Sequence, residues 1–386
     1  MAASLNRFIF RKELSSAINE RLEKRYRDEW IDSQHELNVV VGLVSRRDPS
    51  LRQIKVIQNF HCTLDIGHFL DSLAGSFVTT LAFVGINMDD DYCSKLAAAI
   101  SASESSLSCL QLCRIVPTGL PQICPAISRS SSLKELRLTF NHDLSQEHVA
   151  LLMKSLGEST NLEIFKLYCV DLENETNLLT DAVRSAQGLK DLRITSCNLK
   201  DITSLARAIK ESNRITRLDL SMNRISDTKA VADLWDCPTI TYLSVSQNEL
   251  GSEELTEETS DDVQQRQFIR LAENKSLLKL YLDMNPLSPG FVACFTKALE
   301  QNYTLRRLGL LTLTVNSDAA RKLRYLVALN CAGRGRMQDF PNPALFPKLL
   351  SRVAREPELI YGLITQAPHV WCATTHQGGL NVNVHK

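Results

Sequence analysis

The stretch ITRLDLSMNRI (residues 215–225) carries apolar residues at its first, fourth, sixth and eleventh positions and an asparagine, Asn223, at its ninth. The spacing of two between Leu218 and Leu220 is typical of a strand with one buried face. Such a strand has no need of an asparagine. The same phasing recurs along the chain, however, so the asparagine belongs to a repeated unit.

The repeated unit is L-x-x-L-x-L-x-x-N/C-x-L, with Ile or Val in place of Leu at some positions. Successive copies lie 25–29 residues apart, except for one step of 37 residues from Ile240 to Leu277. The ten copies begin at Leu51, Val78, Leu107, Leu133, Leu162, Leu189, Ile215, Ile240, Leu277 and Leu305. The strongest copies are LKELRLTFN (133–141), ITRLDLSMN (215–223), ITYLSVSQN (240–248) and LLKLYLDMN (277–285). A period in the range of about 20–29 residues is the mark of leucine-rich repeats. Over about residues 51–315 the chain therefore resembles the leucine-rich-repeat family, and within it the long, helix-containing class of the ribonuclease inhibitors.

Each copy predicts a strand followed by a helix. The segments 148–159, 202–212 and 290–302 carry apolar residues at helical spacing, i, i+3, i+4 and i+7. We therefore predict an α/β fold, a right-handed leucine-rich-repeat solenoid (horseshoe) with a parallel concave sheet of about ten strands, convex helices and helical caps at both ends.

The asparagine position predicts a buried ladder of side-chain amides, because an amide can satisfy both donors and acceptors of a turn that neither sheet nor helix pairs. Its expected members are Asn59, Asn141, Asn223, Asn248 and Asn285. Four copies carry an apolar residue there instead, namely Ile86, Ile115, Val170 and Leu313, and one copy carries Cys197.

The pattern divides the chain into three parts. Residues 1–50 are predicted as an N-terminal helical cap or its approach, with an amphipathic helix over 12–30, and residues 51–315 as the solenoid. The 37-residue step contains about nine extra residues and coincides with GSEELTEETSDD (251–262), an acidic insertion near 250–265. Residues 316–386 are predicted as the last repeat helix and a helical C-terminal cap. Their LNCAGRGR (329–336) and helical tail resemble the C-terminal extension of uncharacterised leucine-rich-repeat proteins of diatoms and related algae.

Bulk composition excludes several classes of protein. The 44 basic and 44 acidic side chains balance, and no apolar run has the roughly 18 residues that a membrane span needs. The N-terminal residues lack a secretory apolar region. The eleven cysteines are scattered, which predicts reduced thiols. We expect a cytoplasmic protein, with the nucleus as the alternative, and neither a membrane nor a nucleic acid as partner.

No catalytic signature is found, including the phosphate-binding loop, the zinc-protease helix and the nucleophile elbow. The sequence therefore predicts no catalytic residue, no cofactor, no metal and no small-molecule substrate. The resemblance implies instead a non-enzymatic scaffold that binds an unidentified partner protein on the concave face, an inference by analogy with the fold.

The residue between the second and third leucine of each copy is expected at the centre of the concave face. These residues are Lys55, Ala82, Gln111, Arg137, Lys166, Arg193, Asp219, Ser244, Tyr281 and Gly309. Because neighbouring strands lie about 4.8 Å apart, Arg137, Lys166 and Arg193 should form a basic row. Arginine, aromatic residues and methionine dominate interface hot spots. The candidate partner-binding residues are accordingly Arg137, Phe140, Lys166, Tyr168, Arg193, Arg217, Asp219, Met222, Tyr242, Tyr281 and Met284.

Two alternatives remain open for these features. Glu135, Glu163 and Asp191 could neutralise the basic row, which would then bind nothing. The acidic segment 253–262 could be a solvated loop or a contact for a basic partner. If the row is a site, Arg137→Glu combined with Arg193→Glu should abolish partner capture and leave the thermal melt unchanged.

Two other functions compete with a simple scaffold. Ran-type GTPase-activating proteins share this repeat class and supply an arginine from a loop near their N-terminal repeats, for which Arg114 in LQLCRIVPTG (110–119) is the nearest candidate. The motif around that arginine does not match, and the acidic tail of that family is missing. A recognition subunit of a ubiquitin ligase is the third hypothesis, although residues 1–50 contain no convincing F-box.

Overall fold

The computed structural model describes residues 31–58, 64–102, 104–115, 117–139, 144–251, 261–310, 318–335 and 346–366. The predicted helix over 12–30 lies outside these residues, as does most of the acidic segment. The chain forms two compact units, Met1–Asn198 and Leu199–Lys386, which are described separately below.

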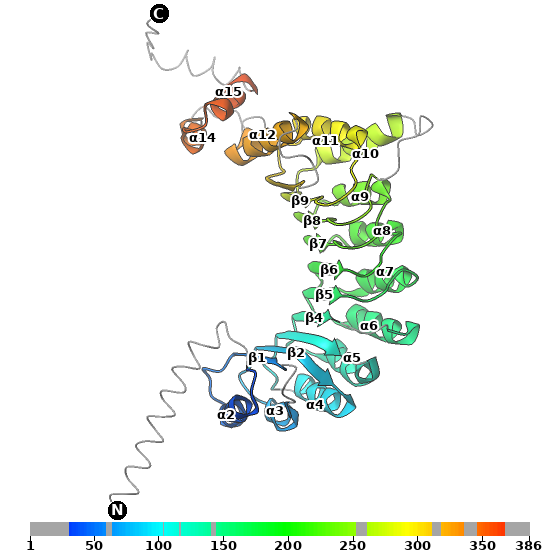
Figure 1. Ribbon diagram of the computed structural model, residues 1–386, viewed down its shortest axis with the longest axis vertical. Coiled ribbons are helices and arrows are strands. Elements are labelled where there is room, and N and C mark those ends of the chain that lie inside the picture. Colours follow the sequence, from blue (N-terminus) through cyan, green and yellow to red (C-terminus); the bar gives the residue numbers. More distant parts are fainter. Residues whose placement is uncertain are drawn as a thin grey trace, which may run out of the picture. The chain divides into compact units, whose positions relative to one another are not determined.

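Ten parallel strands follow one another in chain order in one sheet, as the repeat predicted (Figure 1). In the first unit they are β1 Gln53–Ile57, β2 Thr80–Met88, β3 Cys109–Ile115, β4 Glu135–Thr139, β5 Ile164–Tyr168 and β6 Asp191–Thr195. In the second unit they are β7 Arg217–Asp219, β8 Tyr242–Ser244, β9 Lys279–Tyr281 and β10 Arg307–Gly309. Every strand begins two residues after the start of its sequence copy. The phasing therefore located all ten strands.

Helices alternate with the strands. The first unit has α2 Gln34–Ser45, α3 Gly67–Ser72, α4 Asp90–Ser101, the 3-10 turn η1 Pro117–Gly119, α5 Leu120–Arg129, α6 Gln146–Glu158 and α7 Thr176–Ser185. The second has α8 Thr203–Ser212, α9 Thr228–Trp235, α10 Asp261–Glu273, α11 Pro289–Gln301, α12 Asp318–Ala332, α14 Phe346–Arg352 and α15 Pro357–Gln366. The three helices predicted from apolar spacing, α6, α8 and α11, are confirmed within two residues at each end.

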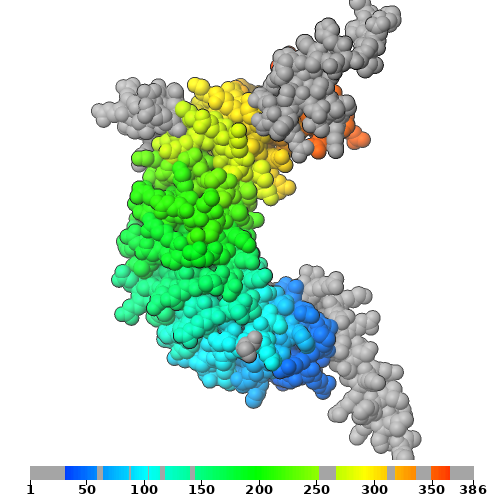
Figure 2. All heavy atoms as spheres, turned by 180° about the vertical axis from the view of Figure 1, so that it is seen from behind, coloured from blue at the N-terminus to red at the C-terminus, as the bar shows by residue number. Residues whose placement is uncertain are grey.

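Within each unit the helices cover one face of the sheet, and the repeats are stacked in chain order (Figures 1 and 2). Alternation along each strand sends its leucines toward the helices. Leu136 and Leu138 of β4 are each 1% exposed, whereas Glu135, Arg137 and Thr139 between them are only partly buried. We call the sheet face that these partly buried residues form, opposite the helices, the open face. It corresponds to the predicted concave face.

The asparagine ladder is confirmed for the three members that the structure describes. Asn223, Asn248 and Asn285 are 1–7% exposed. The side-chain oxygen of each accepts a hydrogen bond from a backbone N–H of the preceding repeat, that of Leu199, Ile225 and Leu250 respectively, at 3.0–3.2 Å. The amide nitrogen of each donates to backbone carbonyls at the end of its own strand. These bonds connect consecutive turns. Asn59 and Asn141 lie outside the described residues.

Where the asparagine is replaced, a different group fills the space. The thiol of Cys197 donates to the carbonyl of Thr195 at 3.3 Å, which reproduces part of the amide's bonding. Ile86 and Val170 are 1% and 2% exposed and fill the same position with apolar contact alone.

A second group of asparagines, which the repeat pattern did not predict, stabilises the turns that enter the strands. Asn302 is completely buried. Its side-chain oxygen accepts from the N–H groups of Thr304 and Leu305, and its amide donates to the carbonyl of Leu271 at 2.8 Å. Asn274 makes the equivalent bonds to Ser276 and Leu277 one repeat earlier. Side-chain amides therefore hold both ends of β9, Asn274 at its start and Asn285 at its end, and Asn302 holds the start of β10.

The C-terminal part of the second unit closes over helix α11 by means of a buried arginine. Arg334 is 2% exposed, and its guanidinium donates to the carbonyls of Leu299 and Asn302 and to the side chain of Asn330 at 2.7–2.9 Å. The ring of Tyr303 lies under the same group. Burial lowers the pKa of Arg334 from its ordinary value. Because the last carbonyls of a helix are unpaired and partly negative, a cation there stabilises the end of α11.

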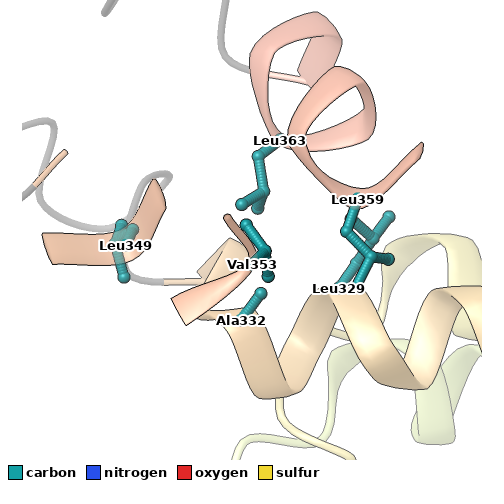
Figure 3. Close-up of a cluster of buried hydrophobic side chains, with 6 residues drawn as sticks. All are labelled: Leu329, Ala332, Leu349, Val353, Leu359 and Leu363. Carbon is teal, nitrogen blue, oxygen red and sulfur yellow. The ribbon is translucent and has the colours of Figure 1, made fainter. Parts of the chain in front are cut away.

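Helices α12, α14 and α15 share one apolar cluster (Figure 3). Its buried members are Leu329, Ala332, Leu349, Val353, Leu359 and Leu363. The cluster is continuous with α12, which itself packs on α11. Helices α14 and α15 are therefore packed on α12.

We predict that Leu218→Ala lowers the free energy of unfolding by about 2–5 kcal/mol, because Leu218 is completely buried and the truncation leaves a cavity. Urea denaturation followed by circular dichroism measures the change. Met222→Ala in the same repeat is the control, since Met222 is 50% exposed and should cost less than about 0.5 kcal/mol. Equal midpoints for the two variants would contradict the placement of Leu218 in the core.

Candidate protein-binding site

The open face of each unit presents the predicted central residues in strict register. In the first unit Lys55, Ala82, Gln111, Arg137, Lys166 and Arg193 are aligned partners on successive strands. In the second unit Asp219, Ser244, Tyr281 and Gly309 are aligned in the same way. The structure thus brings Arg137, Lys166 and Arg193 together, as the sequence predicted.

Two of these three bases share a carboxylate. Glu135 Oε1 lies 2.7 Å from both Arg137 Nε and Lys166 Nζ, and the side chain of Lys166 is only 8% exposed. Burial raises the pKa of Glu135, but the hydrogen bonds and charges of Arg137 and Lys166 outweigh burial and lower that pKa from 4.5 to about 2. Glu135 therefore stays ionised and compensates its two neighbours.

The third base is also paired within its own strand. Arg193 donates to Asp191 through two nitrogens at 2.8 and 3.0 Å, the bidentate geometry that makes arginine–carboxylate pairs strong. Glu163, the third acid that could neutralise the row, pairs instead with Lys190 at 2.9 Å and Lys134 at 3.9 Å. Glu163 does not neutralise the row because Glu163 and both lysines precede their strands, and so lie next to each other rather than beside the row.

Neutralisation by internal carboxylates makes the basic row of the first unit less available to a ligand. Its cations already have carboxylate partners, so a ligand would have to displace an internal ion pair. Arg137→Glu or Arg193→Glu would place two carboxylates side by side and lower stability. The double charge reversal should therefore shift the thermal melt, contrary to our sequence expectation, and is not a clean test of binding.

The open face of the second unit is organised by an arginine and two tyrosines. The guanidinium of Arg217 lies 3.8 Å from the centroid of the Tyr242 ring, and the Tyr242 and Tyr281 rings are 5.3 Å apart at 41°. Burial raises the pKa of Tyr242, with Asp219 adding to the effect, so its phenol stays neutral. Contacts of this kind preorganise the side chains for binding.

Gly309 makes room for these side chains. A Cβ at Gly309 would collide with the carboxylate of Asp283 and would lie 2.7 Å from Tyr281 Cδ1. The absence of a side chain on β10 thus allows the Tyr281 ring and Asp283 to extend over it. Asp219, the other acid on this face, accepts a hydrogen bond from the backbone of Ser221 at 3.1 Å.

Two methionines are exposed at the turns that end β7 and β9. Met222 and Met284 are 50% and 58% exposed, among the highest values for large apolar side chains in the described part of the chain. Both have a left-handed backbone, with φ of 59° and 56°, as does Gln247 of the intervening repeat with φ of 54°. The left-handed residue precedes the buried asparagine and turns the chain inward. Its own side chain is consequently directed outward to solvent.

The remaining candidates are distributed as follows. Tyr168 is half-buried on the open face of β5, aligned with Thr139 and Thr195. Phe140 lies outside the described residues. The backbone of Arg114 belongs to strand β3, so it does not come from a loop as the GTPase-activating comparison requires.

Two residues that sequence reasoning missed complete the surface. Lys279 and Arg307 occupy the first position of β9 and β10, aligned with Tyr242 of β8. The sequence contains a signal for both residues, because the candidate Arg217 holds the same position in its own repeat. Neither Lys279 nor Arg307 stands at the central position between the two leucines, so the pattern at that position does not reveal them.

The described residues contain no group of three or more metal-ligating side chains. None of the described helices is long and apolar enough to span a bilayer. The cysteines that the structure describes are free thiols. Burial is the main cause that raises the pKa of the Cys109 thiol to about 11 and that of Cys197 to about 12, so neither is poised as a nucleophile.

Comparison with known proteins adds little beyond the fold. No family model matches the chain. None of the curated proteins matches it. One of the solved structures similar to it is internalin C2 of Listeria monocytogenes, at 17% identity and a TM-score of 0.31, covering 58% of this chain and 80% of that one. The parallel sheet with alternating helices fits a leucine-rich-repeat solenoid on its own geometry.

We predict that Glu135→Gln destabilises the protein in a pH-dependent manner. The folded-state pKa of Glu135 is about 2, against 4.5 for the free group. A lowered pKa contributes stability that is fully present above pH 4.5 and is lost as the pH falls toward 2. The difference in unfolding free energy between wild type and variant should therefore be greatest above pH 4.5, at most about 3 kcal/mol, and should shrink toward pH 2.

Urea denaturation at intervals between pH 2 and pH 7 measures this difference. Glu158→Gln is the control, since the Glu158 side chain is 53% exposed in its pair with Lys154. A difference for Glu135→Gln that does not change with pH would contradict the ion-paired arrangement.

Proposed function

We propose that this protein is a non-enzymatic scaffold of the ribonuclease-inhibitor-like repeat class that binds a partner protein on the open face of its strands. It works without a cofactor, in the cytoplasm or nucleus. The observation that carries the proposal is that the second unit combines the exposed Met222 and Met284, at the turns that end β7 and β9, with the stacked Arg217, Tyr242 and Tyr281. Methionine, tyrosine and arginine are the side chains in which interface binding energy concentrates.

The two units support this proposal to different degrees. The bases of the first unit are paired with carboxylates, and Lys166 is nearly inaccessible. In the second unit the exposed Met222 and Met284 are apolar, and Arg217, Tyr242 and Tyr281 are held in place by stacking. We therefore assign the main contact to Arg217, Asp219, Met222, Tyr242, Tyr281 and Met284. The candidates of the first unit, Arg137, Lys166, Tyr168 and Arg193, are proposed as secondary contacts.

We predict that Met222→Asn combined with Met284→Asn lowers partner capture at least about fivefold without changing the denaturation midpoint. Asparagine tolerates the left-handed backbone of both positions, so only the exposed apolar surface is lost. Capture from a lysate of the source organism, quantified by mass spectrometry against wild type, measures the effect.

Gln247→Asn is the matched control, because it makes a polar-to-polar change at the same turn position of the repeat between the two methionines. It should leave capture unchanged. If the double methionine variant retained the same captured proteins in the same amounts as wild type, the binding site would not be on this face.

A further inference from the structure

The first position of each strand in the second unit forms a row of cations around one tyrosine. Arg217, Tyr242, Lys279 and Arg307 are aligned partners on β7, β8, β9 and β10. We call these four residues the basic–aromatic row. Lys279 and Arg307 are direct neighbours across adjacent strands, an arrangement of like charges that destabilises a sheet unless something compensates it.

Nothing within the described part of the chain compensates them. Neither Lys279 nor Arg307 has an ion pair or hydrogen bond with another described side chain, and Arg307 is exposed. The first unit offers an internal comparison, because the equivalent strand position there holds Glu135 and Asp191, each of which neutralises a base. The same fold thus satisfies its cations in one unit and leaves two of them available in the other.

The carboxylates nearby on the same strands are engaged elsewhere. Asp219 accepts from Ser221, and Asp283 lies over Gly309 at the opposite end of the strand from Lys279. The Tyr281 ring stacks on Tyr242 of the row, and the exposed thioethers of Met222 and Met284 lie at the turns that follow the opposite ends of β7 and β9. The surface therefore combines uncompensated positive charge with accessible apolar side chains.

We propose that the second unit binds a protein segment that carries both acidic and apolar side chains, its carboxylates pairing with Lys279 and Arg307 and its apolar groups covering Tyr281 and the two methionines. This inference rests on the proposed function and names the chemistry of the partner. Charge complementarity at the row gives selectivity and faster association, and the apolar contact supplies much of the affinity.

A single-stranded nucleic acid is the less favoured occupant. Bases stack on open aromatic faces, but one face of Tyr242 is covered by the Arg217 guanidinium, and the Tyr281 ring lies tilted beside it. Exposed methionine thioethers also suit apolar side chains better than phosphates.

The test is selection of a random 12-residue peptide library, displayed on phage, against the immobilised full-length chain. Selected peptides should be enriched in Asp and Glu together with Leu, Met or Phe relative to the unselected library. One selected peptide, labelled with fluorescein, is then titrated by fluorescence anisotropy. Its affinity should fall at least about tenfold for Lys279→Glu combined with Arg307→Glu, and should weaken when salt rises from about 50 to about 300 mM.

The matched control is Arg207→Glu combined with Lys229→Glu, which makes the same change in net charge on helices α8 and α9 of the same unit. Both residues are exposed and have no ion pair with a described side chain. This variant should bind the peptide as wild type does. Equal losses in the two charge-reversal variants would overturn the proposal, as would a library that yields no binder above the unselected level.

Failure of this inference can be told apart from failure of the proposed function. Peptides without acidic enrichment that lose binding in Met222→Asn combined with Met284→Asn would leave the binding face in place and overturn the acidic partner. If peptide binding were unaffected both by that variant and by the Lys279 and Arg307 charge reversal, the open face of the second unit would not be the binding site, and the proposed function would be overturned as well.

Three outcomes of these binding measurements would assign the basic–aromatic row to a different occupant. Tighter peptide binding after Glu253→Gln, Glu254→Gln, Glu257→Gln and Glu258→Gln would show that the chain's own acidic segment occupies the row, which overturns a separate partner. Binding of a fluorescein-labelled random 12-nucleotide RNA that depends on Lys279 and Arg307, with no peptide selected, would assign the row to nucleic acid. A dimer that dissociates on the same charge reversal would assign it to a second copy of this chain.

Discussion

The burial of two alternate leucines on each short parallel strand is the constraint on which the rest of the structure depends. In β7 and the residue after it, Leu218 and Leu220 are both completely buried. Because strand side chains alternate between faces, Arg217 and Asp219 are left on the opposite face. A shift of one residue would bury a charged side chain and expose a leucine. The free-energy cost of both changes fixes the strand register. The asparagine ladder adds a second constraint on the register, since each amide connects the end of its own strand to the preceding turn.

The open face is therefore free to vary in chemistry while the framework stays constant, and the two units use that freedom differently. In the first unit, acids at the first strand position balance bases at the third, as Glu135 does for Arg137 and Lys166. Such pairing satisfies charges that would be costly to bury alone. In the second unit the first position is basic or aromatic, and Lys279 and Arg307 stay without a carboxylate among the described residues. Charge compensation, more than the number of bases, therefore distinguishes the two surfaces. In the first unit the bases of the basic row are paired internally, whereas the second unit presents cations that a partner could pair.

The sequence predicted the fold well because its signal is repeated. Each strand starts two residues after its predicted copy, since periodicity reports which residues are buried. It predicted the charged surface less well, because ion pairing depends on side-chain reach. Glu163 was one of three acids that could neutralise the row, but it is bound by Lys190 and Lys134. The burial of Arg334 against the carbonyls of Leu299 and Asn302, at the end of α11, has no signal in the repeat pattern. Lys279 stands at the first strand position, outside the central position between the two leucines, so the pattern at the central position does not reveal it.

We propose that the partner binds the strands of the second unit, with the neutralised row of the first unit as a secondary surface. Residue-resolved lysine acylation, followed by mass spectrometry with and without a captured partner, tests this most directly. Lys166 should react slowly in both states, because its side chain is 8% exposed and paired with Glu135. Lys279 should react readily in the free protein and become protected in the complex, while Lys229 on α9 keeps its rate. Protection of Lys229, or of Lys134 and Lys190, which precede β4 and β6 in the first unit, with Lys279 still reactive, would contradict this placement of the partner.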